Sequence, residues 1–217
     1  MKKLVVFDCD GTLVDSQAAI VRSMATAFAA AGLAAPDGNA VRRIVGLSLP
    51  QALVELAPAA TEDQRRHALE AYKASFRGMR QDGTLEQPLY PGIAALLARL
   101  HARGHVLGVA TGMSDRGLEA CLVRHGVRRL FTTLQTADRH PSKPHPAMLT
   151  AALFEAGIAP ADAVMVGDTI FDIAMARSAG VRAIGVAWGY HDPAELSEAG
   201  AAGVAESGEE LEELIDG

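Results

Sequence analysis

The residues whose types and positions most favour chemistry are Asp8, Asp10, Thr111, Lys143 and Asp168. Asp8 and Asp10 directly follow a short apolar segment near the N-terminus, and Thr111 and Asp168 follow two further segments of the same kind. Lys143 lies in the turn Ser-Lys-Pro-His-Pro, ahead of a helical pattern. If the apolar segments are parallel strands, their carboxyl ends meet at one edge of a sheet, where such proteins bind ligands. We therefore expect three carboxylates, one hydroxyl and one ammonium group to converge there.

Three aspartates in one place limit what the cluster can do. Asp8, Asp10 and Asp168 cannot all remain ionised at short range without a compensating cation. Ligation by oxygen atoms alone, with room left for water and phosphate oxygens, favours Mg²⁺ over zinc. Lys143 and the backbone amides around Thr111 would supply hydrogen-bond donors for an oxyanion. This set of groups suits phosphoryl transfer, in which positioning and electrostatic stabilisation do most of the catalysis.

Asp8 and Asp10 are two residues apart, which allows a division of roles. Only the carboxylate that faces the substrate can attack phosphorus, and its partner is then placed to handle the proton of the leaving group. A carboxylate nucleophile forms an acyl phosphate and so replaces one difficult displacement with two easier ones. The second aspartate would act first as a general acid and then as a general base on water.

Short apolar runs supply the strands that such a site needs. They are continuous rather than alternating, as expected for strands buried on both faces of a parallel sheet. Four clear runs and a weaker fifth are Leu4–Phe7, Val106–Ala110, Ala163–Val166, Ala183–Ala187 and Phe131–Leu134. Helical patterns separate the later runs, at Gly117–His125, Pro146–Ala156 and Asp172–Ala179. The alternation predicts an α/β fold with a doubly wound parallel sheet.

Residues 16–86 interrupt this alternation and predict a helical insert. The segment has no buried-strand pattern but carries four helical patterns, at Ala18–Ala31, Val41–Val45, Gln51–Ala57 and Glu62–Met79. We expect a helical cap domain of residues 16–86 inserted into an α/β core domain of residues 1–15 and 87–217. The chain would cross between them near Val14–Ser16 and Glu86–Tyr90, and paired crossings of this kind can act as hinges. The acidic tail Glu206–Gly217 predicts a short docked amphipathic helix.

The composition excludes several other classes of protein. Of the 217 residues, 49% are hydrophobic and 21% charged, which is enough to bury a core. With a net charge of −6, the chain lacks the basic surface expected of a protein that binds nucleic acid or a membrane surface. Two cysteines are too few for a disulfide framework, and no run approaches the roughly 20 apolar residues of a membrane span. We expect a cytoplasmic protein, monomeric or homodimeric, whose partner is a small molecule.

Four motifs stand in order along the chain at the predicted strand ends and loops. They are Asp8-x-Asp10-Gly-Thr-Leu-Val-Asp15-Ser16, Ala110-Thr111-Gly112, Lys143-Pro-x-Pro and Gly167-Asp168-Thr169-x-x-Asp172. Together they resemble motifs I to IV of the haloacid dehalogenase-like hydrolases, most closely the phosphoglycolate phosphatase-like branch. The resemblance covers nearly the whole chain. It implies a Mg²⁺-dependent phosphatase that hydrolyses a small phosphomonoester, phosphoglycolate being the leading candidate, through an aspartyl-phosphate.

The resemblance also implies roles for the acidic residues. Asp8 would be the nucleophile and Asp10 the general acid and base. Mg²⁺ would be held by the Asp8 carboxylate, the Asp10 backbone carbonyl and the Asp168 carboxylate. Asp172 would orient Lys143 or a water molecule bound to the metal.

The remaining motif residues and the insert would bind the substrate. Thr111, the Gly112 amide and Lys143 would hold the phosphate. Many relatives have Asn or Ser at the position of Gly112, so this chain keeps the amide there but lacks a side-chain contact. The insert matches the helical cap of the family, and Arg42, Arg43 and Gly46 are candidate substrate contacts near its tip. The two arginines also suit a solvated helix face.

Other functions remain compatible with the same residues. A sugar-phosphate mutase or a pyrophosphatase would keep every motif. A haloacid dehalogenase would need neither a metal nor Asp10, and a phospho-receiver signalling module would be shorter and lack the insert. A catalytically inactive binding protein would have no need of the full set of chemical residues. Trp188, Tyr190 and His191 follow the last predicted strand and are expected to pack at the sheet edge.

Overall fold

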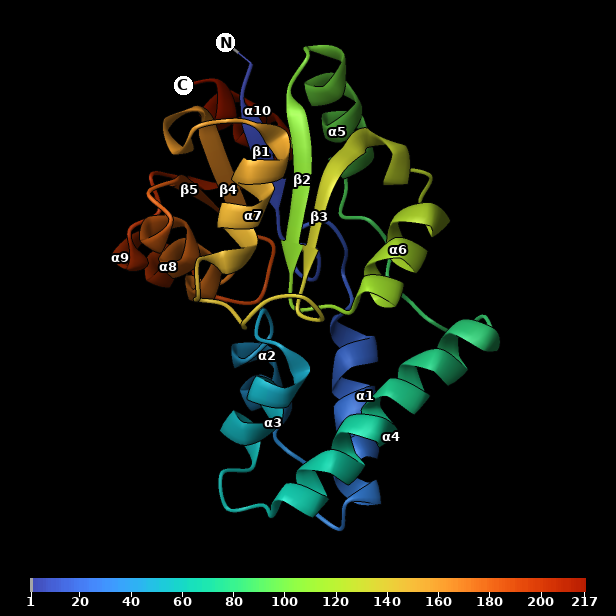
Figure 1. Cartoon of the computed structure of the whole chain (residues 1–217). Helices are drawn as coiled ribbons and strands as arrows, with labels where there is room; N and C mark the ends of the chain where they lie inside the picture. Colours follow the sequence, from blue (N-terminus) through green and yellow to red (C-terminus); the bar gives the residue numbers. More distant parts are fainter. Residues whose placement is uncertain (1) are drawn as a thin grey trace.

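A computed structural model describes residues 2–217, which fold around one six-stranded sheet (Figure 1). The strands are β1 (Leu4–Phe7), β2 (Val106–Thr111), β3 (Phe131–Thr136), β4 (Ala163–Gly167), β5 (Arg182–Val186) and β6 (Val204–Ala205). They lie in the order β3-β2-β1-β4-β5-β6, and all neighbouring pairs are parallel. β1 therefore lies between β2 and β4, where the strand order reverses. Doubly wound sheets bind their ligands at this point.

Helices cover both faces of the sheet, and this explains the continuous apolar runs. The helices beside the sheet are α5 (Ile93–Ala102), α6 (Asp115–Arg124), α7 (Ala147–Ala156), α8 (Ile170–Ser178), α9 (Pro193–Ala199) and α10 (Gly208–Asp216). Val5 and Phe7 pack with residues of α5, α6 and α10, whereas Leu4 and Val6 pack with residues of α7, α8 and α9. All four β1 side chains are fully buried. Because both faces of β1 are buried, polar and apolar residues do not alternate along the strand.

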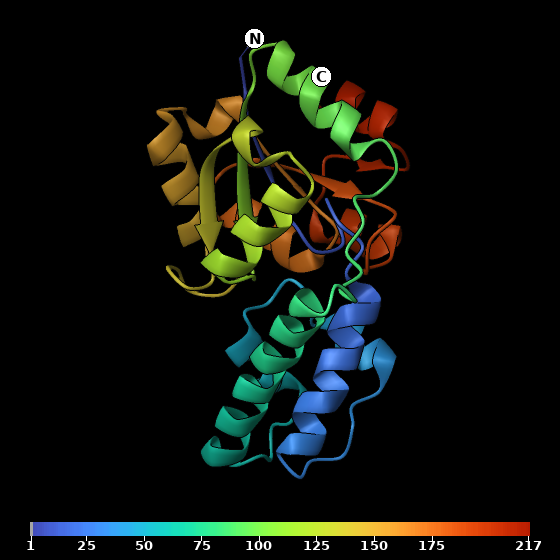
Figure 2. The same cartoon turned by 90° about the vertical axis from the view of Figure 1, so that its right-hand side faces the viewer.

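Four helices between β1 and α5 form a bundle below the sheet in the view of Figure 1. They are α1 (Gln17–Ala30), α2 (Gly38–Arg43), α3 (Leu49–Leu56) and α4 (Glu62–Gln81). We call residues 16–86 the cap. α1 and α4 lie side by side (Figure 2), and Met24, Phe28 and Ala68 are buried in the cap's own apolar core. α4 begins at a capping box, in which the Thr61 hydroxyl accepts a hydrogen bond from the Gln64 amide at 3.2 Å.

The two chain crossings between sheet and cap are paired with each other. Val14 and Leu89 form an antiparallel bridge. The Asp15 amide donates to the Pro88 carbonyl at 2.9 Å, and the Tyr90 amide donates to the Leu13 carbonyl at 3.0 Å. Because only these two segments connect the cap covalently to the sheet, a change in cap position requires bending here.

The predicted elements are recovered with boundary shifts of a few residues. The five apolar runs correspond to β1–β5, and the acidic tail forms α10, which buries Leu211 and Ile215. Three elements, α5, α9 and β6, lie outside the predicted set. Short 3₁₀ turns at Arg128–Leu130 and Pro160–Asp162 precede β3 and β4. Within residues 2–217, none of the helices has the length and apolar character needed to cross a membrane.

Candidate active site

Asp8 directly follows β1, and its side chain is buried at the carboxyl edge of the sheet. Its Oδ1 accepts a hydrogen bond from the Cys9 amide at 2.6 Å and lies 2.9 Å from Nζ of Lys143. Its Oδ2 is buried and has no hydrogen-bond partner within the described residues. A buried carboxylate oxygen without a partner is unfavourable unless a ligand completes the site. Asp8 is therefore the residue at which a ligand is most needed.

Lys143 is a fully buried lysine held between two carboxylates. Its Nζ lies 2.9 Å from Oδ1 of Asp8 and 2.6 Å from Oδ1 of Asp172. Burial opposes the charged form, but Asp172 and Asp8 outweigh it and hold the pKa of Lys143 above its usual value. Oδ2 of Asp172 accepts from the Thr169 amide at 3.1 Å and the Thr169 hydroxyl at 2.7 Å, at the start of α8. Lys143 is thus a fixed positive charge beside Asp8.

The ionisation of Asp8 is balanced between opposing effects. Burial, and to a smaller extent the negative charges of Asp172 and Asp10, raise the pKa of Asp8, while Lys143 acts to lower it. The net result is a pKa of about 7. A cation bound next to Asp8 would shift this balance towards the ionised carboxylate.

Asp10 is hydrogen-bonded to a residue at the start of the cap. Its Oδ1 accepts from the Ser16 hydroxyl at 2.5 Å, and the Ser16 oxygen lies 3.1 Å from the Tyr190 hydroxyl. Burial raises the pKa of Asp10, against the opposite effects of the Ser16 hydrogen bond and Lys143. A carboxyl group with a raised pKa can retain a proton for transfer, as a general acid must.

Asp168 follows β4, and both of its carboxylate oxygens are partnered. Oδ1 accepts from the Thr12 hydroxyl at 2.7 Å, and Oδ2 accepts from the Tyr190 backbone amide at 3.0 Å. Burial raises the pKa of Asp168, and the charges of Asp8 and Asp172 raise it further. These contacts connect the ends of β1, β4 and β5 at one carboxylate.

Two glycines allow the chain to pass close to Asp168. Gly11 has a φ of +84°, and a Cβ on it would lie 2.2 Å from Asp168 Oδ2. A Cβ on Gly189 would lie 2.1 Å from the Asp168 Cβ. Any larger residue would displace the carboxylate. Close packing, and not only a turn, therefore requires glycine at both positions.

The acidic cluster fits a divalent cation. Carboxylate oxygens of Asp8, Asp168 and Asp172, one from each residue, lie within 4.8 Å of one another. All three residues are buried, all offer oxygen, and Oδ2 of Asp8 lacks a partner. Oxygen ligands with net negative charge are those that Mg²⁺ prefers. The geometric group contains Asp172, whereas the resemblance assigns Asp10 to the metal through its backbone carbonyl.

The loop between α2 and α3 brings the cap against the strand ends. Gly46, with a φ of +99°, lies so close to the core that a Cβ on it would approach Thr169 Oγ1 to 3.0 Å. The Ser48 amide donates to the Ser142 hydroxyl at 2.8 Å, next to Lys143. The cap is therefore docked on the core in this structure. Gly46 is the one predicted cap contact that reaches the site.

A cavity of about 420 Å³ lies between the strand ends and the cap. From the core it is lined by Asp8, Asp10, Thr111 and Gly112, and the cap contributes Gly46. Four cationic side chains also line it, Lys73, Arg77 and Arg80 of α4 and Arg116 of α6. Thr111 is buried, and its hydroxyl accepts from the Met113 amide at 3.2 Å. The cavity joins the predicted catalytic residues to a positively charged wall.

Arg42 and Arg43 do not line this cavity. Arg43 pairs instead with Glu195 of α9 at 2.7 Å, and its carbonyl accepts a hydrogen bond from Nε2 of His191 at 3.2 Å. Arg42 lies beside the side-chain amide of Gln17 on α1. Arg43 therefore connects cap and core, and its exposed ion pair contributes about 0–1 kcal/mol.

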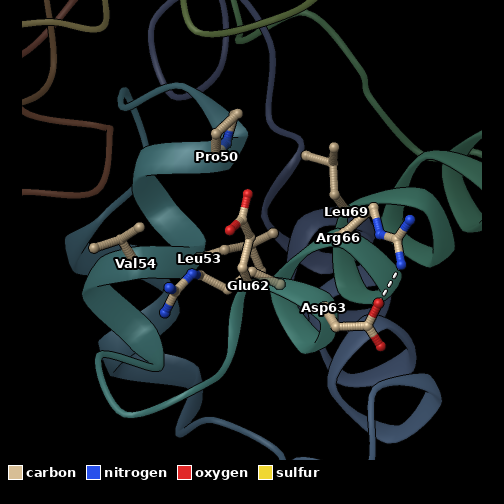
Figure 3. A pocket seen from close by; sticks show the side chains of 8 residues that line it. Pro50, Leu53, Val54, Glu62, Asp63, Arg66 and Leu69 are labelled. Atoms are coloured by element: carbon tan, nitrogen blue, oxygen red, sulfur yellow. Dashed lines mark hydrogen bonds and ion pairs between the residues drawn. The ribbon is translucent and has the colours of Figure 1, made fainter.

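A second hollow, of about 690 Å³, lies on the cap between α3 and α4 (Figure 3). Pro50 and Leu69 line both this hollow and the catalytic cavity. The charged residues of the hollow include Asp63 and Arg66, which form an ion pair. None of the core residues of the site lines it.

Three residues of the site have roles that the sequence did not predict. Tyr190 was expected to pack at the sheet edge, but it contacts both Asp168 and Ser16. Ser16 stood in the first motif without a role and binds Asp10. Gln87 lines the cavity from the second crossing and has a buried side-chain nitrogen without a partner in the described chain. Its sequence neighbours carry no signal for this position.

Comparison with known proteins identifies related sequences over most of the chain. A family model described as haloacid dehalogenase-like hydrolase matches residues 5–186. A "Probable phosphatase IndB" from Dickeya dadantii strain 3937 is 38% identical over 205 residues, which cover 92% of this chain and 87% of that protein. A phosphoglycolate phosphatase from Rhodospirillum rubrum is 34% identical over 196 residues, covering 88% and 81%.

The same comparison with solved structures supports the fold. A crystal structure described as that of a predicted phosphatase from Clostridium acetobutylicum superposes with a TM-score of 0.88. It is 28% identical in sequence, and the match covers 99% of this chain and 98% of that one. The similarity therefore includes the sheet and the helical cap.

Proposed function

Because the chain belongs to the haloacid dehalogenase-like hydrolases, we propose that it is a phosphatase that uses Asp8 as a covalent nucleophile. Its substrate would be a small phosphomonoester, with phosphoglycolate as the reference compound because several relatives are named for its hydrolysis. The observation that carries the proposal is the buried Asp8 carboxylate, which has one oxygen without a partner and lines the cavity. Residues 16–86 would act as the cap domain over a core of residues 1–15 and 87–217.

The first chemical step would transfer the phosphoryl group to the protein. A carboxylate oxygen of Asp8 attacks phosphorus, and the bond between phosphorus and the ester oxygen breaks. Asp10, whose pKa is raised by burial, donates its proton to the departing oxygen. The products are the free alcohol and an aspartyl-phosphate.

The second step would return the carboxylate to its starting state. Asp10, now ionised, accepts a proton from a water molecule, whose oxygen attacks phosphorus. The bond between phosphorus and the Asp8 oxygen breaks, and inorganic phosphate leaves. The Ser16 hydroxyl holds the Asp10 carboxylate at 2.5 Å, which supports one orientation for both proton transfers.

Fixed charges beside Asp8 would reduce the electrostatic cost of bringing two anions together. Lys143 and the backbone amide of Gly112 would hold phosphate oxygens, with the Thr111 hydroxyl beside them. A Mg²⁺ ion held by the Asp8 and Asp168 carboxylates and the Asp10 backbone carbonyl would neutralise charge on the phosphoryl group. Asp172 keeps Lys143 in place through the 2.6 Å contact.

The direct test measures release of inorganic phosphate from a panel of phosphomonoesters and pyrophosphate, with Mg²⁺ and with a chelator. We expect release that requires Mg²⁺, and an Asp8→Asn variant whose rate is lower by at least about 10⁴-fold. Brief reaction with labelled substrate should leave label on Asp8 of the wild-type protein and none on the variant. Absence of release from every compound, or equal rates for both proteins, would contradict the proposal. A compound that is isomerised without phosphate release would identify a mutase.

A further inference from the structure

The cavity is much larger than the phosphate site itself, and the cap supplies most of its remaining wall. Ile20 and Met24 of α1 and Tyr72 and Phe76 of α4 line it and are apolar or aromatic. Ile20 and Met24 are 7% and 1% exposed. At about 420 Å³ the cavity falls within the range of about 300–1,000 Å³ that is typical of sites for drug-sized ligands. A two-carbon acid such as glycolate would fill only a small part of a cavity of this size.

The aromatic pair gives the wall a specific character. Tyr72 and Phe76 are four residues apart on α4 and so project from the same face of the helix. Their ring centroids lie 5.1 Å apart, with an angle of 35° between the ring planes. A further ring can pack against such a pair in an offset or edge-on arrangement, and the Met24 thioether also favours aromatic contact.

A polar group on the same cavity also lacks a partner. Gln87 is 3% exposed, and its side-chain Nε2 has no hydrogen-bond partner within the described chain. A buried donor without an acceptor is unfavourable, so a ligand that offers an acceptor would be bound more tightly than one that does not. Gln87 lies on the crossing segment at the junction of cap and core and lines the cavity.

The cations on the cavity can attract the phosphate group of any phosphomonoester. Lys73, Arg77 and Arg116 are exposed, and Arg80 is half-buried. Their charges raise the local concentration of any anionic substrate. Recognition of an uncharged organic part would instead come from the apolar wall and from Gln87.

We propose that the substrate is a phosphomonoester whose organic part contains an aromatic ring that packs on Tyr72 and Phe76, with a hydrogen-bond acceptor for Gln87. This inference rests on the proposed phosphatase activity and specifies its substrate class. The ring would lie in the cavity against Tyr72 and Phe76 of α4 while the phosphate reaches Asp8.

The test compares four phosphomonoesters of primary alcohols, which have similar leaving groups. They are benzyl phosphate, 4-carbamoylbenzyl phosphate, cyclohexylmethyl phosphate and phosphoglycolate. We expect kcat/KM for benzyl phosphate to exceed that for phosphoglycolate by at least about tenfold, and that for cyclohexylmethyl phosphate by about three- to tenfold. The carbamoyl group should add a further gain through Gln87.

Variants show whether the named residues cause these ratios. Phe76→Leu should move the benzyl to cyclohexylmethyl ratio towards one, and Gln87→Leu should remove the gain from the carbamoyl group. Phe154 is 88% exposed on α7, so Phe154→Leu is the matched control and should leave both ratios unchanged. Because each readout is a ratio within one protein, partial loss of folded protein does not affect it.

The outcomes separate this inference from the proposed function. Hydrolysis of phosphoglycolate at a kcat/KM equal to or above that of benzyl phosphate would overturn the substrate class and leave the phosphatase activity standing. A wild-type preference for the ring that survives Phe76→Leu would overturn the assigned wall. If neither these four compounds nor any compound of the wider panel released phosphate, the proposed function itself would be overturned.

Discussion

Gly112 of the core lies so close to Leu47 of the cap that a Cβ on Gly112 would stand 2.4 Å from the Leu47 carbonyl oxygen. The Gly46 carbonyl oxygen would be 3.1 Å from the same Cβ. Both obstacles are backbone atoms, which cannot move aside as a flexible side chain can. The absence of a side chain at Gly112 thus permits the docked position of the cap. What the sequence presents as a missing substrate contact is, in the structure, space occupied by the cap.

We expect Gly112→Ala to prevent the cap from docking as it does here. The added methyl group would push the loop at Leu47 away from the phosphate site, and misplacement by about 1 Å can lower a rate by about 10²-fold. Steady-state kinetics should show a fall of that size in kcat/KM, while urea unfolding of the core changes little.

Gly78 provides the control for this substitution. It lies within α4 with no atom near its Cβ position and no positive φ. Gly78→Ala should leave kcat/KM unchanged and stabilise the protein by about 0.5–1 kcal/mol. If Gly112→Ala were as active as Gly78→Ala, the close approach of Leu47 would not matter for catalysis.

Asp10→Asn should slow turnover by about 10²–10⁴-fold, because the amide cannot donate or accept the required proton. The Asn side chain can still accept a hydrogen bond from the Ser16 hydroxyl, so the fold should be preserved. Rapid-mixing experiments should show slower formation and slower hydrolysis of the phosphoprotein. A rate within threefold of wild type would show that another group transfers the proton.

Lys143→Met should destabilise the protein when a chelator is present. The substitution leaves Asp8 and Asp172 buried without the cation that lies 2.9 Å and 2.6 Å from them. Removing one partner of a buried ion pair lowers the free energy of unfolding by about 3–5 kcal/mol, which urea unfolding would measure. Lys2→Met, at an exposed lysine, is the control and should change stability by less than about 0.5 kcal/mol. Equal midpoints for the two variants would contradict the pairing.

The free energy of unfolding should depend on pH through His105. This residue is buried just before β2, at the opposite end of the strand from the candidate site. Burial lowers the pKa of His105, and the charges of Arg103 and Lys3 act in the same direction against Asp216. Below pH about 6.5 the unfolded chain therefore binds more protons than the folded protein at this residue. The contribution of neutral His105 to the free energy of unfolding is complete above that pH and is lost as the pH falls further.

Urea unfolding between pH 8 and 5 should reveal this contribution as a difference between variants. His105→Gln should show a smaller loss of unfolding free energy with falling pH than the wild-type protein. His101 is exposed near the end of α5, four residues before His105, so His101→Gln should retain the wild-type slope. Other titrating groups contribute equally to all three proteins, and identical slopes would exclude His105 as a source.

The strands and the position of Asp8 at their carboxyl edge could be predicted because their signals are local. Leu4–Phe7 is continuous and apolar since both faces of β1 are covered, and Asp8 follows it directly. The elements that were not predicted differ in how strong their sequence signals are. α5 has Ile93, Leu96, Leu97 and Leu100 at helical spacing and could have been identified, whereas β6 has two residues and no periodicity.

The supporting contacts of the site could not be predicted because they depend on the path of the chain in space. Tyr190 reaches Asp168 and Ser16 only because the loop after β5 returns across the strand ends. Arg43 faces Glu195, 152 residues away, for a similar reason. Gln87 is polar and stands beside a proline, which in sequence is indistinguishable from a surface loop.

The central position of β1 has a consequence for synthesis of the protein on the ribosome. β1 emerges first, yet its partners are β2 and β4, whose pairing begins at Leu4 with Val106 and with Ala163. By contrast, the buried residues of the cap's apolar core all lie between Ile20 and Ala68, and Tyr190 packs against this core from the loop after β5. We expect the cap to become compact while β1 is still without neighbours. Asp8, the proposed nucleophile, then reaches its site only after more than two-thirds of the chain has been translated, so premature termination would leave Asp8 without the strands that position it.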